Sequence, residues 1–295
     1  MKISIISFVP GTYSLRRIRQ AALDRKHSVK VLEAFQLSLE CAREGRRILL
    51  RGKPLPPCDA VIPRFGAASD AIGQAFVRHF EECGTFSLNS SRSIAMARDK
   101  LLTMQLLNGQ GIDTPASAFV LSAQDIAPAI ERLGGPPVII KVIEGTQGIG
   151  VMLAESVKGA EAIFETMQVN RQHVILQKFI TESKGKDIRA FVVGGKVVAA
   201  MRRSARNGEF RSNFHRGGQV EKVILEPAYE TAAIRAAEIM GLSVAGVDIL
   251  ESNDGPKIME LNSSPGLEGI EGATNVNVAR AIIEFIEKTV VLQAS

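Results

Sequence analysis

The sequence contains two apolar runs that each carry one acidic residue, Val244-Ala245-Gly246-Val247-Asp248-Ile249-Leu250 and Lys257-Ile258-Met259-Glu260-Leu261-Asn262. Both runs are predicted to be β-strands of one hairpin, because the segment between them contains the Asn, Asp and Gly that tight turns prefer. A hairpin centred on Asp254 places Asp248 opposite Glu260, with Cβ atoms about 5 Å apart. Two like charges at that separation repel one another unless something positive lies between them.

A divalent-metal site is the interpretation that this hairpin favours. Asn262 joins the two carboxylates, because residues two apart on a strand share a face of the sheet. Carboxylate and amide oxygens are hard ligands, which suit Mg²⁺ or Mn²⁺. The alternative is a hairpin whose acidic residues face solvent. Asp248 argues against that alternative, since an unpaired carboxylate within so apolar a run is costly.

A second candidate site follows the predicted strand 138–143, which contains Lys141. The strand runs directly into Glu144-Gly145-Thr146-Gln147-Gly148-Ile149-Gly150. Glycines let backbone N–H groups approach a triphosphate closely, and Lys141 supplies a positive charge at the root of the loop. The alternative is a lysine that extends to the edge of its sheet beside an ordinary turn. The loop matches neither the P-loop pattern nor the dinucleotide fingerprint.

The segment 201–218 is rich in arginine, with Arg202, Arg203, Arg206, Arg211 and Arg216. Guanidinium groups bind phosphate and carboxylate through paired hydrogen bonds, so the segment suits a reaction with several anionic substrates. A solvated basic loop or an RNA-binding surface is the alternative. Few aromatic residues interrupt the segment, which disfavours stacking on RNA bases.

The composition excludes several classes of protein. The chain has 295 residues, of which 45% are hydrophobic, with a formal net charge of +5, so a folded protein is expected rather than a disordered one. No apolar run approaches the roughly 18 residues of a membrane-spanning helix, and no signal-peptide cleavage site is evident. We therefore expect a cytoplasmic protein without a membrane partner. Because the basic residues are spread along the chain, we expect no direct sequence-specific binding of nucleic acid.

The cysteine and histidine patterns exclude further kinds of site. Cys41, Cys58 and Cys83 form no CxxC pair, so neither a disulfide framework nor a zinc site is predicted. The histidines are dispersed, and the sequence contains no HExxH and no GxSxG. A zinc hydrolase and a Ser-His-Asp enzyme are thereby disfavoured.

The order of predicted elements indicates an α/β unit followed by two α+β units. Strands and helices alternate in the first third, which predicts a small parallel sheet. One helix is expected over about 93–108, and a tight hairpin at Gly194-Gly195. A last helix is expected over about 276–288. We expect the domains to span 1–95, 96–180 and 181–295.

Several segments together resemble the RimK family of ATP-grasp ligases, and the resemblance runs nearly end to end. They are 93–100 (SIAMARDK), 144–150, Asp187-Ile188-Arg189, 210–218 (FRSNFHRGG) and 259–266 (MELNSSPG). The resemblance implies an ATP-grasp fold with an N-terminal pre-ATP-grasp α/β domain. It also implies ATP as substrate and Mg²⁺ or Mn²⁺ as cofactor, with two ions expected.

Site residues follow from the resemblance position by position. The metal ligands match Asp248, Glu260 and Asn262. The ATP-binding residues match Lys100, Lys141, Gly145, Gly148, Gln177, Lys178, Phe179, Ile180, Asp187, Arg211, Ser212 and Asn213, with residues 177–180 as the adenine hinge and Asp187 on the ribose. Two positions depart from the pattern: Lys178 stands where the family usually has Glu, and Arg202 stands where an acidic residue is expected.

The implied reaction activates a carboxylate as an acyl phosphate and joins it to an amine, with Arg203 and Arg211 stabilising the tetrahedral oxyanion. The resemblance points to addition of L-glutamate to the C-terminal carboxylate of a small-subunit ribosomal protein. Another ATP-grasp amino-acid ligase, acting on a carrier protein of lysine biosynthesis or as a γ-glutamyl ligase for a cofactor, is an alternative. A non-catalytic nucleotide-binding protein is a further alternative, and a homo-oligomer stays open.

Overall fold

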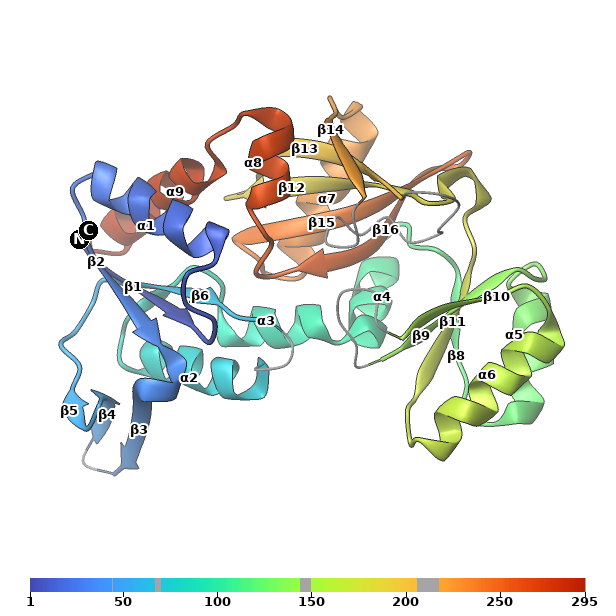
Figure 1. The fold of residues 1–295 in the computed structure, drawn as a ribbon, viewed down its shortest axis with the longest axis horizontal. Helices are drawn as coiled ribbons and strands as arrows, with labels where there is room; N and C mark the ends of the chain where they lie inside the picture. Colours follow the sequence, from blue (N-terminus) through green and yellow to red (C-terminus); the bar gives the residue numbers. More distant parts are fainter. Residues whose placement is uncertain (44, 67–69, 144–149, 206–217, 295) are drawn as a thin grey trace.

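The structure is a computed structural model that describes residues 1–43, 45–66, 70–143, 150–205 and 218–294. The three larger sheets occupy different parts of the molecule, with the first third of the chain at one end and residues 117–178 at the other (Figure 1). The sheet of the last third lies between and above them. Helices and sheets are mixed, as the sequence predicts.

The first sheet is parallel and has the strand order β2-β1-β6-β7. Its inner strand β1 is buried at nearly every position, with the small residues Ser4 and Ser7 enclosed together with its isoleucines, and burial on both faces is typical of parallel strands. Helix α1 begins where Thr12 caps the backbone N–H of Leu15. The bounds are β1 Lys2–Ser7, α1 Tyr13–Asp24, β2 Ser28–Glu33, β6 Ala60–Arg64, α2 Asp70–Glu82 and β7 Phe86–Ser87.

A small antiparallel sheet branches off this unit, and the sequence analysis did not find it. Its strands are mostly exposed and carry mixed polar residues, so they lack the run of apolar residues by which buried strands are recognised. The bounds are the 3₁₀ turn η1 Ala34–Gln36, β3 Leu37–Ala42, β4 Gly45–Leu50 and β5 Lys53–Pro54.

The second sheet is antiparallel, with the order β10-β9-β11-β8, and two helices pack on one of its faces (Figure 1). Its apolar core lies between the sheet and these helices and includes Ile140 and Phe164. The bounds are β8 Ser117–Phe119, η3 Ala123–Asp125, α5 Ile126–Arg132, β9 Val138–Val142, β10 Val151–Ala154, α6 Val157–Val169 and β11 Val174–Lys178.

The third sheet has the order β14-β13-β12-β15-β16 and contains both predicted hairpins. One face is apolar and packs on α7 through residues such as Val247 and Leu261. The bounds are η4 Thr181–Ser183, β12 Lys186–Val193, β13 Lys196–Ser204, β14 Gln219–Lys222, α7 Pro227–Ile239, β15 Val244–Ser252, β16 Gly255–Asn262, α8 Glu268–Thr274 and α9 Val278–Ala294.

The helix expected over about 93–108 is two helices, α3 Ser91–Arg98 and α4 Lys100–Gly109. Asp99 leaves the helical conformation, with φ −80° and ψ 103°, and its side chain accepts a hydrogen bond from the N–H of Leu102 at 2.9 Å. Asp favours such caps over helix interiors because its carboxylate competes for backbone N–H groups. The break makes Lys100 the first residue of α4.

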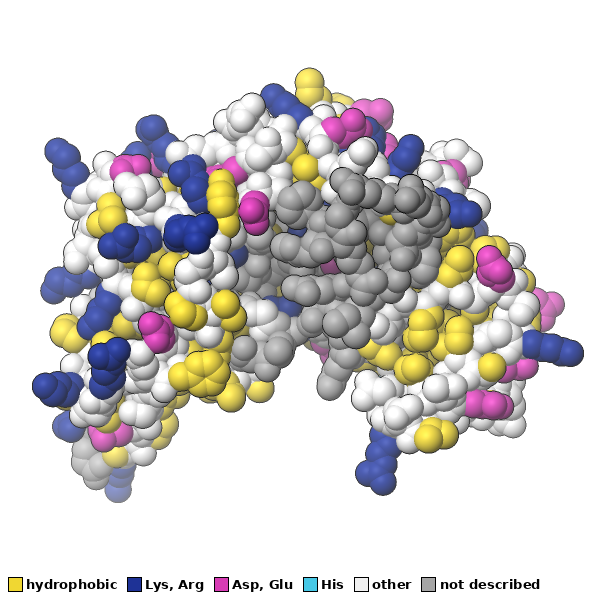
Figure 2. Space-filling view, viewed as in Figure 1, with side chains coloured by type: hydrophobic (Ala, Val, Ile, Leu, Met, Phe, Trp, Pro, Cys, Tyr) yellow, Lys and Arg dark blue, Asp and Glu magenta, His cyan; other side chains and the backbone are white. Residues whose placement is uncertain are grey.

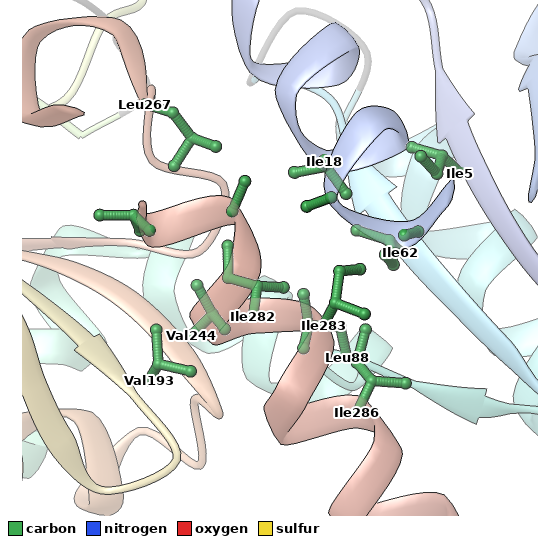
Figure 3. Packing of buried hydrophobic residues seen from close by; sticks show 14 of the residues in the cluster. Ile5, Ile18, Ile62, Leu88, Val193, Val244, Leu267, Ile282, Ile283 and Ile286 are labelled. Carbon is green, nitrogen blue, oxygen red and sulfur yellow. The ribbon is translucent and has the colours of Figure 1, made fainter. Parts of the chain in front are cut away.

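The largest apolar core joins the two ends of the chain. Helix α9 packs against α1, and its Ile282, Ile283 and Ile286 lie close to Ile18 (Figure 3). The same cluster includes Val193 and Val244 of the third sheet. Helix α9 therefore connects the first sheet to the third.

The surface carries scattered positive charge. Lysine and arginine side chains stand apart from one another over the first unit on the face shown in Figure 2. Cys41, Cys58 and Cys83 are all free thiols, as predicted. Among the helices of the described ranges, none combines the length and apolar character needed to cross a membrane.

Candidate active site

A row of charged side chains crosses the face of the third sheet that is turned away from α7. Backbone pairing places Arg189 of β12 opposite Asp248 of β15, and Asp248 opposite Glu260 of β16. On the other side of β12, Asp187 stands opposite Arg203 of β13. Since these side chains come from neighbouring strands and share one face, they lie within reach of one another.

The predicted pairing of Asp248 with Glu260 is confirmed, although the turn is not centred where we expected. Ser252 pairs with Gly255, which makes Asn253 and Asp254 the two turn residues. A β-bulge after Asp248 then inserts one extra residue into β16, so Ile249 pairs with Ile258 while Asp248 pairs with Glu260. The bulge turns Glu260 onto the face of Asp248 and leaves Ile258 in the apolar core, the re-aiming that bulges often provide beside functional sites.

Asp248 is enclosed by two arginines. Arg189 donates from Nε and Nη2 to the two carboxylate oxygens, each at 2.6 Å, and Arg203 Nη2 lies 2.8 Å from Oδ2. The Asp248 side chain is only 1% exposed. Burial opposes its ionisation, but the charges of Arg189 and Arg203 outweigh burial and hold the pKa of Asp248 well below its usual range.

Arg203 connects Asp248 to a second buried acid. Its Nε and Nη2 donate to the carboxylate of Asp187 at 2.6 and 2.8 Å. Arg203 and Asp187 are 4% and 2% exposed. Both residues are thus deeply buried and hydrogen-bonded to each other, and their predicted roles, the ribose contact of Asp187 and oxyanion stabilisation by Arg203, stay predictions.

Glu260 lies at the accessible end of the row. Burial and the neighbouring charge of Asp248 raise the pKa of the Glu260 carboxyl. The amide of Asn262 donates to Glu260 Oε1 at 3.3 Å. Glu260 and Asn262 are half-buried, and the raised pKa shows that added positive charge beside Glu260 would be favourable.

Two lysines face this acidic end from other elements. Burial and repulsion from Lys100 lower the pKa of Lys141 to about 8, against the opposing attraction of Glu260 and Asp248. Lys100 Nζ donates to the backbone carbonyl of Ile143 at 2.7 Å. Lys141 on β9 and Lys100 on α4 therefore approach the third sheet from the second sheet and its preceding helix.

A narrow, partly open cleft lies among these elements. It is lined by Ala97, Lys100, Thr103, Met104, Lys141, Ile175, Gln177, Met259, Glu260 and Leu261. The lining places both predicted phosphate lysines, one predicted hinge residue and one predicted metal ligand around a single space. Cationic walls opposite a carboxylate suit a polyphosphate that carries a divalent cation.

The predicted hinge begins at the edge of this cleft. Gln177 is buried, and its amide donates to Ser117 Oγ at 2.9 Å. Lys178 ends β11 with an exposed side chain, while its backbone N–H donates to the carbonyl of Ala116 at 2.8 Å. Phe179 is half-buried and Ile180 is buried.

Some predicted residues lie outside the described residues, and others were missed. Gly145, Gly148, Arg211, Ser212 and Asn213 belong to the first group. Within the described ranges no group of three or more His, Cys, Asp or Glu side chains is arranged to hold a metal ion; the proposed set instead combines Asp248 and Glu260 with the amide of Asn262. Arg189 was missed, although its spacing of two from Asp187 signals a shared face of the sheet.

Comparison with family models covers nearly the whole chain. Residues 1–94 match the RimK pre-ATP-grasp domain, and residues 97–286 match the RimK-like ATP-grasp domain. The chain belongs to the RimK-like ATP-grasp family. Members of this family that resemble it include a probable alpha-L-glutamate ligase of Rhodopirellula baltica, 52% identical over 98% of this chain and 72% of the relative. Another, from Picosynechococcus, is 50% identical over 98% of this chain and 96% of the relative.

Solved structures show the same RimK-like fold. The ATP-grasp ligase PsnB, complexed with minimal precursor, Mg and ADP, matches with a TM-score of 0.77 and 20% identity, over 98% of this chain and 97% of PsnB. A RimK domain protein from Sphaerobacter thermophilus matches with a TM-score of 0.74 and 21% identity, over 97% and 99% of the two chains. The predicted ATP-grasp fold with a pre-ATP-grasp domain is confirmed, and the chain is an ATP-dependent carboxylate–amine ligase.

Proposed function

We propose that this protein is an ATP-dependent α-L-glutamate ligase that extends the C-terminal carboxylate of a small-subunit ribosomal protein. The observation that carries the ligase part is the cleft in which Lys100 and Lys141 face Glu260, in a chain half identical to probable alpha-L-glutamate ligases. The ribosomal acceptor rests on the resemblance to the RimK family. Such a protein would work in the cytoplasm, where ATP and ribosomal proteins occur together.

ATP is proposed to bind between the second and third sheets. Lys100 and Lys141 carry the charges that would bind its phosphates. Residues 177–180 would hold the adenine, with the backbone rather than the exposed Lys178 side chain reading the base. Asp187 would contact the ribose after a rearrangement of its ion pair with Arg203, and Gly145, Gly148 and Arg211–Asn213 would complete the phosphate site.

The donor set at the end of the charged row fits Mg²⁺ or Mn²⁺. Glu260 and Asn262 are half-buried oxygen donors, and burial together with the charge of Asp248 raises the pKa of Glu260. Asp248 is the third proposed ligand, although Arg189 occupies both of its oxygens in this structure. When held by these residues, the metal would supply positive charge to offset the negative charge that develops during phosphoryl transfer. Two ions are expected.

The protein's own groups would serve the two halves of the reaction. The acceptor carboxylate attacks the γ-phosphate, ADP leaves, and the amine of glutamate then displaces phosphate from the acyl phosphate. Lys100 and Lys141 would orient the phosphates. Arg203 and Arg211 would stabilise the tetrahedral oxyanion, since a guanidinium is an effective donor to developing negative charge.

The division into domains 1–95, 96–180 and 181–295 is part of the proposal. Each of the three larger sheets falls within one of these ranges. Helix α9 belongs to the third range but packs on α1 of the first range. A homo-oligomer stays a prediction.

The decisive experiment measures ADP release by purified protein with ATP, Mg²⁺ and each amino acid in turn, with and without a mixture of purified ribosomal proteins. Mass spectrometry then identifies the acceptor. We expect ADP release that depends on L-glutamate and one small-subunit protein that gains glutamate-sized increments at its C-terminus. Glutamate-dependent mass gain on a small carboxylic acid or a carrier protein would retain the ligase and remove the ribosomal acceptor. If ADP release needs no amine, or if no ADP is released, the ligase function itself would be ruled out.

A further inference from the structure

Arg64 is the last residue of β6, at a special position in the first sheet. The chain passes from β1 to β2 on one side and then returns to β6 on the other side of β1. In open parallel sheets the strand order reverses at such a point, and ligands bind beyond the carboxyl ends of the two strands that meet there. Ser7 and Arg64 pair at the carboxyl ends of β1 and β6, so Arg64 projects from the preferred binding edge.

The environment of Arg64, which is half-buried, differs from that of the arginines in the charged row. Its Nη2 donates to the backbone carbonyl of Pro265 at 2.9 Å. Burial lowers the pKa of Arg64 to about 10, so the group remains a cation at neutral pH. Among the residues that the structure describes, no carboxylate pairs with Arg64, whereas Arg189 and Arg203 both contact Asp248.

The walls beside Arg64 are rigid. Phe8 and Phe65 follow the two strands and pack edge to face, with ring centroids 6.1 Å apart. Arg98 of α3 donates to the carbonyl of Phe65 at 3.2 Å. The backbone on both sides of Arg64 is therefore held in place by packing and hydrogen bonding, which limits the conformational entropy lost when a ligand binds there.

The contact with Pro265 connects Arg64 to the charged row. Pro265 lies over Gly246 so closely that a Cβ on Gly246 would meet Pro265 Cβ at 2.8 Å and Arg189 Nε at 3.6 Å. On the other side of this turn, the N–H of Leu267 donates to Ser14 Oγ of α1 at 2.9 Å. The turn that follows β16 is therefore clamped to the first unit beside Arg64.

We propose that Arg64 binds a carboxylate group of the substrates, and that the carboxyl edge of β1 and β6 is the part of the site that recognises the acidic substrate. This inference rests on the proposed ligase function and names the residue that would select among substrates. A guanidinium matches a planar carboxylate through paired hydrogen bonds, and a half-buried cation that has no acidic partner among the described residues can bind such a group favourably. The predicted phosphate lysines belong to β9 and α4, so Arg64 is separate from the nucleotide contacts.

The carboxylate has two sources, the incoming glutamate and the acceptor chain, and kinetics separates them. Arg64→Met and Arg64→Lys are measured with saturating ATP while L-glutamate and the acceptor are varied in turn. We expect Arg64→Met to raise the KM of one of these substrates roughly 10- to 100-fold, the loss of a charge-assisted hydrogen bond. Arg64→Lys keeps the positive charge but loses the paired N–H donors of the guanidinium. Its KM for that substrate should lie between the values of Arg64→Met and the unmodified protein.

A third arm uses L-glutamine as the amine substrate. If Arg64 binds the glutamate side chain, Arg64→Met reduces the preference for L-glutamate over L-glutamine by the same factor as it raises the KM. If it binds the acceptor, that preference is unchanged and the acceptor KM rises. Either result supports a carboxylate subsite at Arg64.

The control is Arg235→Met. Arg235 also donates to a backbone carbonyl, that of Gln110, but it is exposed on α7, so its loss should leave every KM within about twofold. A fall in melting temperature for Arg64→Met with unchanged KM values for glutamate and acceptor would overturn the proposal, since a purely structural contact with Pro265 predicts that result. An increased KM for ATP alone would overturn it as well.

Failure of the ligase function gives a different result. In that case the unmodified protein shows no amine-dependent ADP release, and binding is measured without turnover. L-Glutamate should then raise the melting temperature of the unmodified protein and of Arg235→Met more than that of Arg64→Met. The same comparison is made with a short peptide that has a free C-terminal carboxylate. Equal shifts in all three proteins with both ligands would reject the subsite independently of the reaction.

Discussion

Two charge networks in this molecule use the same residue types at different depths. In the charged row of the third sheet, the side chains of Asp187, Arg203 and Asp248 are 2%, 4% and 1% exposed. In the network that joins α1 to α9, the side chains of Arg25 and Glu287 are 29% and 24% exposed, and Glu287 also contacts His27 at 2.6 Å. The first network crosses a sheet beside the cleft, and the second clamps two helices at the surface.

The difference between these networks concerns what each ion pair contributes. Exposed pairs gain little, typically up to about 1 kcal/mol, because water already solvates both charges. The two charges of a buried pair attract each other more strongly, but their burial also costs desolvation free energy. Removal of one partner therefore leaves a costly unpaired charge. The charged row also carries Glu260, which accepts a hydrogen bond from the amide of Asn262 and whose pKa is raised by burial and by the charge of Asp248. We infer that the surface network serves assembly of the fold, while the buried row is arranged for a ligand.

The largest effect should come from Glu260→Gln, which keeps the shape but removes the charge. Turnover should fall at least ~10³-fold, because metal-assisted stabilisation of transferring phosphate is worth several kcal/mol. Stability without metal should instead increase. Steady-state ADP release and thermal melting in chelator-treated buffer check the two parts.

The pH dependence of this variant has a definite sign. Because the folded protein raises the pKa of Glu260 above its ordinary 4.5, stability decreases as pH rises through that value and towards the folded pKa. The gain in stability of Glu260→Gln over the unmodified protein should therefore be present at neutral pH and vanish below the ordinary pKa of a glutamate carboxyl. A variant that melts lower than the unmodified protein at neutral pH would contradict the raised pKa of Glu260.

Arg203→Met should have the next largest effect, on stability. It leaves both Asp187 and Asp248 without a donor that they use, and removal of one partner of a buried pair costs about 3–5 kcal/mol. Urea unfolding measures the loss. The matched surface variant, Arg25→Met, should change stability much less, because water solvates both charges of its ion pairs. Equal losses of unfolding free energy in Arg203→Met and Arg25→Met would contradict the inferred difference between the two networks.

Lys141→Ala tests the cation at the boundary of the buried row. ATP affinity should fall roughly tenfold or more with the loss of a charge-assisted contact to phosphate. Since the pKa of Lys141 is lowered to about 8, the unmodified protein should also bind ATP more weakly as pH rises past that value. Calorimetry from about pH 7 to about pH 9 measures both. Unchanged affinity in the variant would make Lys141 a structural strand residue.

Glu287→Gln should have the smallest effect, at most about 1 kcal/mol of stability. The hydrogen bond from Arg25, opposed by burial and supported by His27, lowers the pKa of Glu287. A lowered carboxyl pKa stabilises the fold above the ordinary pKa and loses that contribution as pH falls through the folded value. The unmodified protein and the variant should therefore differ at neutral pH and converge in acid, as followed by thermal melting. A constant difference across pH would show that packing, not charge, is responsible.

Local patterns in the sequence predicted much of the site. Asp248 and Glu260 were paired from the hairpin alone, and the pairing holds because the bulge compensates for a turn placed differently from our expectation. The break at Asp99 was missed, since the apolar period continues across it while a single carboxylate cap decides the geometry. Hydrophobic periodicity reports burial more directly than it reports where a helix stops.

Contacts between distant segments were not predictable from local patterns. Nothing in Ile62-Pro63-Arg64-Phe65 signals that the arginine will meet the carbonyl of Pro265. The ion pairs of Arg189 and Arg203 with Asp248 likewise depend on the order of strands in the third sheet. Such contacts follow from topology, which one sequence constrains only weakly.

The position of α9 has a consequence for synthesis on the ribosome. Ile3 and Ile5 of β1 share one apolar cluster with Ile282, Ile283 and Ile286. Strand β1 and helix α1 leave the ribosome well before α9, so they cannot complete this core until α9 has been made. Until then α1 exposes the apolar face around Ile18, so a nascent chain that stalls before α9 should be a substrate for chaperones and proteases.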